Sequence, residues 1–579
     1  MGSDRLIDWA STAPPVDTPA DSLLVLGALA SKVAEAQSVD SPKALPLTNV
    51  SSDVTAWIDR VPDNALTPDI LGVAWEILIT PVERRRRGAH FTPREVVDRV
   101  CELAVAHLAP SRSVRSVWDP AVGGGAFLLG AARALEQLGP HGREEIVPAL
   151  SGTDIDPVAL RVSDASLELW SGAGARASFT EADALLSESG PFDLIVGNPP
   201  FLGQLHADTT RSDRRRHEVA EKLGSATRGY VDEASVFLLR SVRSLSPKGV
   251  CTLILPESSL GAAHGAEIRR EVAASTVLAG MWIADDQVFD AAVDVVAPIL
   301  VRDPRPPGGG HTDVALGAAA PTTATTPDPQ SWAPLLARRL GVPSVYLDGP
   351  HTLGEIADVT AGFRQHFYGI ADAVKERGDS TSTHRLVTSG AIDLFRNRFG
   401  SSMIRFAGTA WVAPVVELEA IADRRVRDWF ADRAVPKILV ASQTRVLEAL
   451  VDVEGSMMPS VPVISVEPHD HSDVWRIAAL LGAPAVSADL ASNAAGTGLS
   501  SGAIRIRAAA LADLPIPADR AAWDEGSVLV RDAHEAAACA DWVAYGRTLL
   551  AFGHAMDRAY GTTTAGTTAW WFERLRIPS

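Results

Sequence analysis

The sequence predicts an α/β fold built around a Rossmann-like domain with a mostly parallel central sheet. Two observations support this prediction. From about residue 90 to residue 300, short apolar runs of strand length alternate with amphipathic stretches of helical spacing. In the same region, three consecutive glycines at 123–125 stand between an apolar run and a helical stretch, which gives the order strand, loop, helix. We also expect a helical segment before this domain and an α+β domain after it.

The expected elements follow one another along the chain, and the periodicity of their apolar residues defines them. The supporting segments are 23–33 and 70–79 before the α/β domain, 114–118, 126–138, 152–155, 194–196, 236–245 and 250–255 within it, and 437–441, 461–466, 528–542 and 547–560 after it.

A chain of 579 residues is too long for one ordinary hydrophobic core, so at least two domains are expected. Repeated Pro, Gly, Thr and Ala between residues 302 and 332 predict a flexible or irregular connection. The expected parts are a helical N-terminal segment at 1–84, the α/β domain at 85–305, a connection at 306–344, a second domain at 345–520 and a helical C-terminal segment at 521–579.

Composition limits the class of protein. The apolar fraction is 46% and no apolar stretch reaches bilayer-spanning length, so we expect a cytoplasmic protein with no membrane partner. The three cysteines lack the spacing of a zinc site or of a disulfide framework, so no metal is expected. A net charge of −18 opposes nucleic-acid binding except at local basic patches. The candidate patches are Arg84–Arg87, Arg211 with Arg214–Arg216, and residues 391–450, where nine Lys or Arg stand against seven Asp or Glu.

The segment from Asp119 to Leu128 contains the glycine loop. Consecutive glycines allow a sharp turn and let a ligand approach the backbone more closely than a side chain would permit. Such a loop suits a nucleotide-like cofactor, and a purely structural turn is the alternative.

Two acids downstream of the loop are candidate cofactor contacts. Asp154 follows the next expected strand, where a carboxylate can accept hydrogen bonds from both ribose hydroxyls. Asp156 precedes a proline and is expected to cap the following helix instead. Asp183 has the spacing for a contact with the adenine amino group of the cofactor, and an ordinary loop aspartate is the alternative.

The most informative segment is Asn198-Pro199-Pro200-Phe201, which ends an apolar run. Both prolines lack a backbone donor, so the Asn198 side-chain oxygen and the Pro199 carbonyl can accept hydrogen bonds from one ligand. Two such acceptors suit an aromatic amino group, because they draw its nitrogen toward tetrahedral geometry and stabilise the charge that develops as it attacks. Phe201 offers a ring on which a flat base can stack. A structural turn is the alternative.

In this order the segments resemble the motifs of the amino-methyltransferases, and they are most similar to the gamma class of N6-adenine DNA methyltransferases. The resemblance covers about residues 85–300 and implies S-adenosylmethionine as the cofactor. One departure is that the family usually has Cys and Ser where Val122 and Gly124 stand here. The cofactor-binding residues implied are Phe91, Thr92, Pro93, Asp119, Pro120, Gly123, Gly125, Phe127, Asp154, Ile155, Asp183, Ala184 and Asn198.

The resemblance also implies the substrate and its contacts. Gln287-Val288-Phe289 resembles the segment whose aromatic ring packs on the opposite face of a flipped base from Phe201, although Phe289 could equally belong to the core. Residues 345–520 are more loosely similar to the target-recognition part of such enzymes, which implies double-stranded DNA as the partner. The candidate DNA contacts are Arg214, Arg215, Arg364 and Arg396.

The implied reaction is direct transfer of the sulfonium methyl group to N6 of an adenine rotated out of the duplex, without a metal or a covalent enzyme intermediate. A restriction-modification or phage-defence setting is implied, with a separate restriction or defence subunit as a candidate partner. The alternatives are methylation of RNA bases, of cytosine N4 or of a protein glutamine, and a non-catalytic DNA-binding or specificity subunit. A nicotinamide-dependent dehydrogenase explains the glycines but leaves Asn-Pro-Pro-Phe unexplained.

Overall fold

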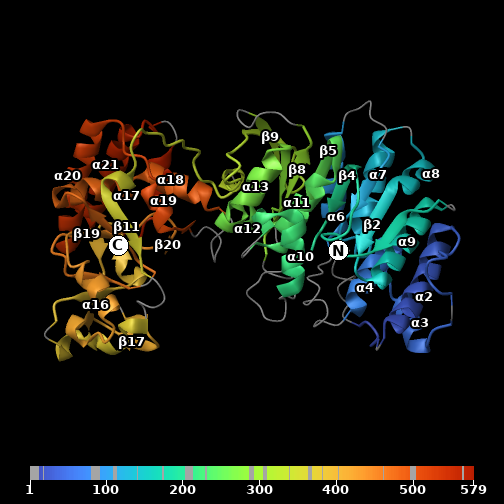
Figure 1. The fold of residues 1–579 in the computed structure, drawn as a ribbon, viewed down its shortest axis with the longest axis horizontal. Helices are drawn as coiled ribbons and strands as arrows, with labels where there is room; N and C mark the ends of the chain where they lie inside the picture. Colours follow the sequence, from blue (N-terminus) through green and yellow to red (C-terminus); the bar gives the residue numbers. More distant parts are fainter. Residues whose placement is uncertain are drawn as a thin grey trace. The chain divides into compact units, whose positions relative to one another are not determined.

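The chain folds into two compact units, residues 1–335 and 336–579, in a computed structural model (Figure 1). The structure describes residues 9, 12–16, 18–47, 49–79, 92–108, 114–139, 141–172, 175–201, 213–227, 231–285, 288, 293–303, 310–337, 339–362, 368–380, 382–401, 403–460, 462–495, 504–563 and 566–578.

A ten-stranded sheet runs through the first unit, in the order β10-β9-β7-β8-β5-β4-β1-β2-β3, with β6 paired to β8. The pairs among β1 to β5 are parallel, and β8 lies antiparallel between β5 and β7. This confirms the predicted Rossmann-like domain with a mostly parallel sheet. The strands are β1 (Val117–Asp119), β2 (Leu150–Asp154), β3 (Ser178–Glu181), β4 (Phe192–Gly197), β5 (Leu245–Leu253), β6 (Leu255–Pro256), β7 (Val277–Ile283), β8 (Val295–Val301), β9 (His311–Leu316) and β10 (Thr322–Thr325).

Helices pack on this sheet through continuous apolar stripes. One hydrophobic core joins β1, β4 and β8 to α6, α7 and α9, while α11 packs on β5 and β6. The expected helix at 126–138 is α7, residue for residue. The helices of the α/β region are α6 (Arg94–Ala106), α7 (Ala126–Leu138), α8 (Arg143–Ile146), α9 (Pro157–Ser171), α10 (Asp213–Leu223), α11 (Glu233–Arg243), α12 (Ser258–Gly261) and α13 (Ala266–Ala273).

The N-terminal helices belong to the same unit. Helices α2 (Pro19–Gln37), α3 (Ser52–Asp59) and α4 (Ile70–Leu78) enclose a second core, which is completed by the outer side of α9. The indole rings of Trp9 and Trp57 stack within it at 4.4 Å. The expected helical lead-in is therefore present, and its packing ties α4 to the α/β region.

The prediction of a flexible or irregular connection at 306–344 is wrong for the central part of that range. There, β9 and β10 form an antiparallel hairpin, and β9 also pairs with β7. Burial alternates along β9, where Thr312 is buried and donates its hydroxyl hydrogen to the Leu278 carbonyl at 2.9 Å. Threonine is β-branched and favours extended backbone, so a Thr- and Ala-rich stretch can form edge strands of a sheet. Residues 304–309 lie outside the described part of the chain.

The second unit contains two small four-stranded sheets and a helical layer. Its main core joins the sheet of β11, β23, β19 and β21 to helices α17, α18, α20 and α21, so the expected C-terminal helices pack on the second domain. The elements of the first sheet and of the helical layer are β11 (Ala357–Ala361), β19 (Lys437–Val440), β21 (Ala449–Asp452), β23 (Ile464–Pro468), α17 (Val474–Gly482), α18 (Pro484–Asn493), α19 (Ala508–Ala512), α20 (Arg520–Ala538), α21 (Trp542–Ala559) and α22 (Thr567–Phe572).

A second sheet, two short hairpins, one pair of strands distant in sequence and one amphipathic helix complete the described part of this unit. In Figure 1, α16 and β17 lie at one end of the unit and α20 and α21 at the other. These elements are β12 (Val374–Glu376), β13 (Arg385–Val387), β18 (Pro414–Val416), β22 (Met457–Pro459), β14 (Ile392–Asp393), β15 (Arg396–Asn397), β16 (Ile404–Phe406), β17 (Thr409–Trp411), β20 (Gln443–Thr444), β24 (Ile504–Arg505) and α16 (Arg424–Ala431).

Among the described residues, no single helix is long and apolar enough to cross a membrane. One bent pair, His471–Gly482 with Pro484–Asn493, meets the length and composition criteria together, and its apolar side chains are part of the main core of the second unit.

The backbone of α4 touches the glycine loop directly. A Cβ atom added to Gly124 would lie 2.4 Å from Cα of Gly72, a distance that real Cβ contacts do not reach. This contact explains why glycine, and not the serine usual in the family, occupies position 124.

Replacing Gly124 with serine is therefore expected to force α4 away from the loop. Overpacking of this kind costs about 1–3 kcal/mol. We expect the thermal unfolding midpoint of Gly124→Ser to fall clearly below that of Gly142→Ser, the matched control, because a Cβ at Gly142 meets nothing within 4 Å. Equal midpoints for the two variants in a calorimetric scan would contradict this contact.

Candidate active site

The site lies where the order of the strands reverses. The chain runs outward from β1 through β2 to β3, then returns to place β4 on the other side of β1 and continues to β5. The loops that leave β1 and β4 therefore diverge at the carboxyl end of the sheet, where open α/β sheets bind ligands. A pocket at this point is lined by residues that follow β1, β2, β3 and β4.

Hydrogen bonds fix the glycine loop in its turn. The backbone N–H of Gly123 donates to Asp154 Oδ2 at 2.9 Å, and the Gly123 carbonyl accepts from the Ser163 hydroxyl at 2.8 Å. Gly125 has a φ of +87° and begins α7, and a Cβ there would lie 3.0 Å from Ser163. Glycine is required at this position by both backbone conformation and space.

Asp154 holds two loops together. Its Oδ2 accepts from Gly123 and its Oδ1 accepts from the backbone N–H of Asp156 at 2.9 Å. A carboxylate has about four lone-pair positions, so these two bonds leave room for ribose hydroxyls. Asp156 caps α9 by accepting from Val158 N–H at 2.9 Å, which confirms the role expected for it.

Asp119 ends β1 in a fully enclosed position. Its Oδ1 accepts from Ala121 N–H at 3.0 Å, and it lies against Gly197, where a Cβ would approach that oxygen to 2.6 Å. Burial raises the pKa of Asp119 to about 8. The hydrogen bond from Ala121 opposes this rise, and the nearby Asp154 adds to it. A carboxyl group of this kind is ready to ionise when a cation binds beside it.

Asp183 contacts an arginine in this structure. The Arg215 guanidinium donates to Asp183 at 3.1 Å and lies 3.0 Å from Glu233. The Arg215 side chain is only 16% exposed and lines the pocket. Its position is therefore internal, and the prediction that Arg215 contacts DNA has no support in its geometry.

The Asn-Pro-Pro segment leaves β4 directly into the pocket. Asn198 and Pro200 line it, and Pro199 between them is buried. Asn198 Nδ2 donates to the Thr92 hydroxyl at 3.0 Å. Because the amide group is planar, this bond fixes the side chain and directs Oδ1 away from Thr92. Thr92 is thus a positioning residue for Asn198.

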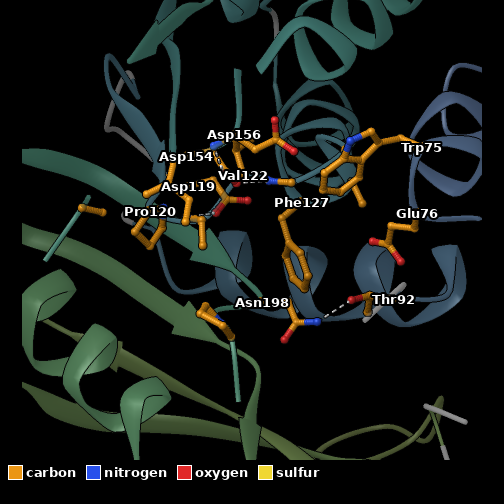
Figure 2. A pocket seen from close by; sticks show the side chains of 18 of the residues that line it. Trp75, Glu76, Thr92, Asp119, Pro120, Val122, Phe127, Asp154, Asp156 and Asn198 are labelled. Atoms are coloured by element: carbon orange, nitrogen blue, oxygen red, sulfur yellow. Dashed lines mark hydrogen bonds between the residues drawn. The ribbon is translucent and has the colours of Figure 1, made fainter. Parts of the chain in front are cut away.

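Figure 2 shows the interior of this pocket. The Phe127 ring projects between the carboxyl groups of Asp119 and Asp154 and the Asn198–Thr92 pair, while Trp75 and Glu76 enter from α4. Sequence reasoning missed Trp75 and Glu76, because they lie in a helical segment without a motif and only tertiary packing brings them to the glycine loop.

The residues present fit the cofactor that the resemblance implies. Of the described residues that line the pocket, six are acidic and two are arginines, and Arg94 and Arg215 both pair with acids. S-adenosylmethionine carries a sulfonium and an ammonium group against one carboxylate and is a net cation, so an acidic lining suits it. The same lining opposes the pyrophosphate of a nicotinamide dinucleotide. The pocket spans about 1160 Å³ of space between protein atoms, part of it open to solvent.

Most of the predicted cofactor residues meet in this one pocket. Those that line it are Thr92, Asp119, Pro120, Gly123, Phe127, Asp154, Ile155, Asp183, Ala184 and Asn198. Pro93 begins α6 beside Thr92, Gly125 begins α7, and Phe201 is half-buried against the core of the α/β region. Phe91, Phe289 and Arg364 lie outside the described residues. Among the described residues, no group of three or more His, Cys, Asp or Glu side chains is placed to hold a metal ion.

Two further candidate DNA contacts differ in their surroundings. Arg214 is 88% exposed and pairs along α10 with Glu218. Arg396 is 19% exposed, lies 3.4 Å from the buried Asp393 and stacks on the Trp542 ring at 4.6 Å. Arg396 is therefore engaged in packing between β15 and α21, which does not support the role predicted for it.

Comparison with known proteins gives matches over part of the chain. The Type II methyltransferase M.PaeR7I of Pseudomonas aeruginosa is 27% identical over 313 residues, which are 50% of this chain and 51% of that protein. The release factor glutamine methyltransferase of Deinococcus radiodurans is 30% identical over 166 residues, 28% of this chain and 54% of that protein. The chain spans between 38% and 51% of the length of the first three curated relatives.

A solved structure extends the likeness of fold to nearly the whole chain. The Type IIL restriction-modification enzyme MmeI in complex with DNA superposes with a TM-score of 0.55 at 13% identity, covering 99% of this chain and 94% of that one. Residues 66–304 match the family model of the N-6 DNA methylases. This region, which contains the glycine loop, the acids and the Asn-Pro-Pro segment, therefore matches the N-6 DNA methylases, and the predicted resemblance to N6-adenine DNA methyltransferases is confirmed.

Proposed function

We propose that this chain is a site-specific, S-adenosylmethionine-dependent methyltransferase of the gamma class that methylates N6 of adenine in double-stranded DNA. The observation that supports it best is the position of Asn198, which is held by Thr92 in the same pocket as the glycine loop. Bound S-adenosylmethionine supplies an electrophilic methyl group. The family match and the M.PaeR7I relative favour DNA as the substrate.

The residues of the chain itself would act by positioning and by accepting hydrogen bonds. Asn198 Oδ1 and the Pro199 carbonyl would accept the two amino hydrogens of the base, which localises the nitrogen lone pair for attack. Pro199 and Pro200 contribute no N–H that could compete for the same acceptors. Phe201, and on the sequence resemblance Phe289, would hold the extruded base by stacking.

A restriction-modification or phage-defence role follows from the same proposal. Double-stranded DNA is then the partner, and a separate restriction or defence subunit is a candidate second partner. A cytoplasmic location remains the sequence-based prediction.

The experiment for this proposal measures transfer of labelled methyl groups to DNA, RNA and protein in parallel. We expect incorporation into duplex DNA, as N6-methyladenine, and a loss of about 100-fold or more in Asn198→Ala with cofactor affinity nearly unchanged. Asn64→Ala, at an exposed position outside the pocket, is the control. If the label appeared only in RNA, in cytosine or in a release factor, that molecule would be the substrate instead of adenine in DNA. Wild-type activity in Asn198→Ala would refute the mechanism.

Thr92 is expected to affect the rate through Asn198. Thr92→Val removes the hydroxyl that accepts from Asn198 Nδ2, so kcat should fall by about 10- to 100-fold. Thr92→Ser keeps a hydroxyl and should restore most of kcat. A Thr92→Val enzyme with normal kcat and a raised KM for the cofactor would show that Thr92 acts on cofactor binding alone.

Asp119 is expected to couple cofactor binding to pH. Its pKa of about 8 means that the group is mostly protonated at pH 7 in the free protein. A bound cation lowers that pKa, so binding of S-adenosylmethionine should release up to about one proton and strengthen as the pH rises from 6 to 8. Calorimetry in two buffers of different ionisation enthalpy measures this release. Undiminished release in Asp119→Asn would assign the proton to another group.

A further inference from the structure

The second unit has a basic hollow whose lining residues belong to none of the sequence motifs described above. It lies between the turn after β13, the β16–β17 hairpin and the C-terminal segment, and Arg398, Arg405 and Arg576 line it. None of the described residues that line it is acidic. In a chain with a net charge of −18, such a local excess of arginine indicates an anionic ligand.

Two buried carboxyl groups lie near these arginines, and one of them pairs with Arg398. Asp393, with 3% of its side chain exposed, lies 3.7 Å from the Arg398 guanidinium. Glu448 is buried and interacts electrostatically with Arg576 and Arg398. Burial raises the pKa of Glu448 to about 7, and the two arginines oppose that rise. Asp393 thus holds Arg398 from inside, and Arg398 and Arg576 both line the hollow.

The hairpin presents the third arginine rigidly. Ala407 and Gly408 both have positive φ, at +49° and +80°, as a tight two-residue turn requires. Phe406 anchors the hairpin, since its ring is 2% exposed in the core around β12, β13 and β18. Arg405 points outward beside Met403, which is 71% exposed. The backbone that carries Arg405 is therefore fixed, and only the side chain becomes ordered when it binds a ligand.

Hydroxyl and backbone groups complete the lining. Ser389 Oγ is buried in the wall and has no hydrogen-bond partner among the described residues. A Cβ at Gly390 would meet only the Thr388 hydroxyl, at 3.9 Å, so there is open space beside the backbone at this position. Guanidinium groups, a hydroxyl donor and open backbone together match the oxygens of a phosphodiester.

We propose that this hollow binds backbone phosphates of the DNA, with Arg398, Arg405 and Arg576 as the contacts. The proposal rests on the function proposed above, because it assumes a DNA substrate, and it replaces Arg396 with arginines that face solvent. A phosphate contact fixes the register of the protein on the duplex without reading its sequence.

The test uses the full chain and a random-sequence duplex DNA, since phosphate contacts do not depend on sequence. The affinity is measured across a range of salt concentrations for wild type, Arg405→Ala, Arg576→Ala and the double variant. Each single change should weaken binding and reduce the slope of log K against log salt by about 0.9. Arg405→Lys should keep the slope. Arg424→Ala loses the same charge from an 84% exposed position on α16 and should bind like wild type.

The outcomes separate this proposal from the function. If wild type methylates duplex DNA while Arg405→Ala and Arg576→Ala keep its affinity and salt slope, the hollow is not a phosphate site although the function stands. An equal loss in Arg424→Ala would show a general effect of net charge and would also overturn it. Loss of binding to duplex RNA but not to DNA would assign the hollow to RNA. Unchanged thermal unfolding midpoints in all variants confirm that the second unit, which carries the substitutions, is folded.

Discussion

The reversal of strand order between β1 and β4 is the constraint on which the site depends. Parallel strands present their carboxyl ends at one edge, and at a reversal the two departing loops turn away from each other and leave space between them. The loop after β1 supplies Asp119 and the glycines, and the loop after β4 supplies Asn198. The topology of the sheet thereby brings Asp119 and Asn198, which are 79 residues apart in the sequence, to one pocket.

This arrangement brings several carboxyl groups into one pocket, and hydrogen bonds from backbone N–H groups reduce the free-energy cost of burying their charge. Asp154 and Asp119 both accept backbone N–H groups, which stabilise a carboxylate where burial opposes it. Burial raises the pKa of both groups, to about 8 for Asp119, and the backbone bonds oppose the rise, two at Asp154 and one at Asp119. Buried carboxyl groups with raised pKa values suit a ligand that is itself a cation, because the positive charge favours their ionised form.

Local patterns were sufficient for the parts of the site that rest on short-range geometry. The glycine turn, the Asp156 cap and the Asn-Pro-Pro segment each depend on a few adjacent residues, and helix α7 has the expected bounds. Contacts across the fold could not be predicted. Trp75 and Glu76 reach the pocket only because Gly72 packs on Gly124, and Arg215 turns inward only because Asp183 and Glu233 receive it. The β9–β10 hairpin was missed because threonine and proline were weighted as signals for loops.

The charged residues that line the two described sites differ in sign, which bears on how an acidic chain could bind a polyanion. Those of the pocket in the first unit are mainly acids, while those of the hollow in the second are arginines, one of which pairs with the buried Asp393. Long-range repulsion from a net charge of −18 is screened beyond about 8 Å at physiological ionic strength. Short-range contacts at the hollow are screened much less, because they form as water is excluded. With acids in the recessed pocket and guanidinium groups at the hollow, one acidic chain would be able to hold both the cationic cofactor and the anionic substrate proposed for it.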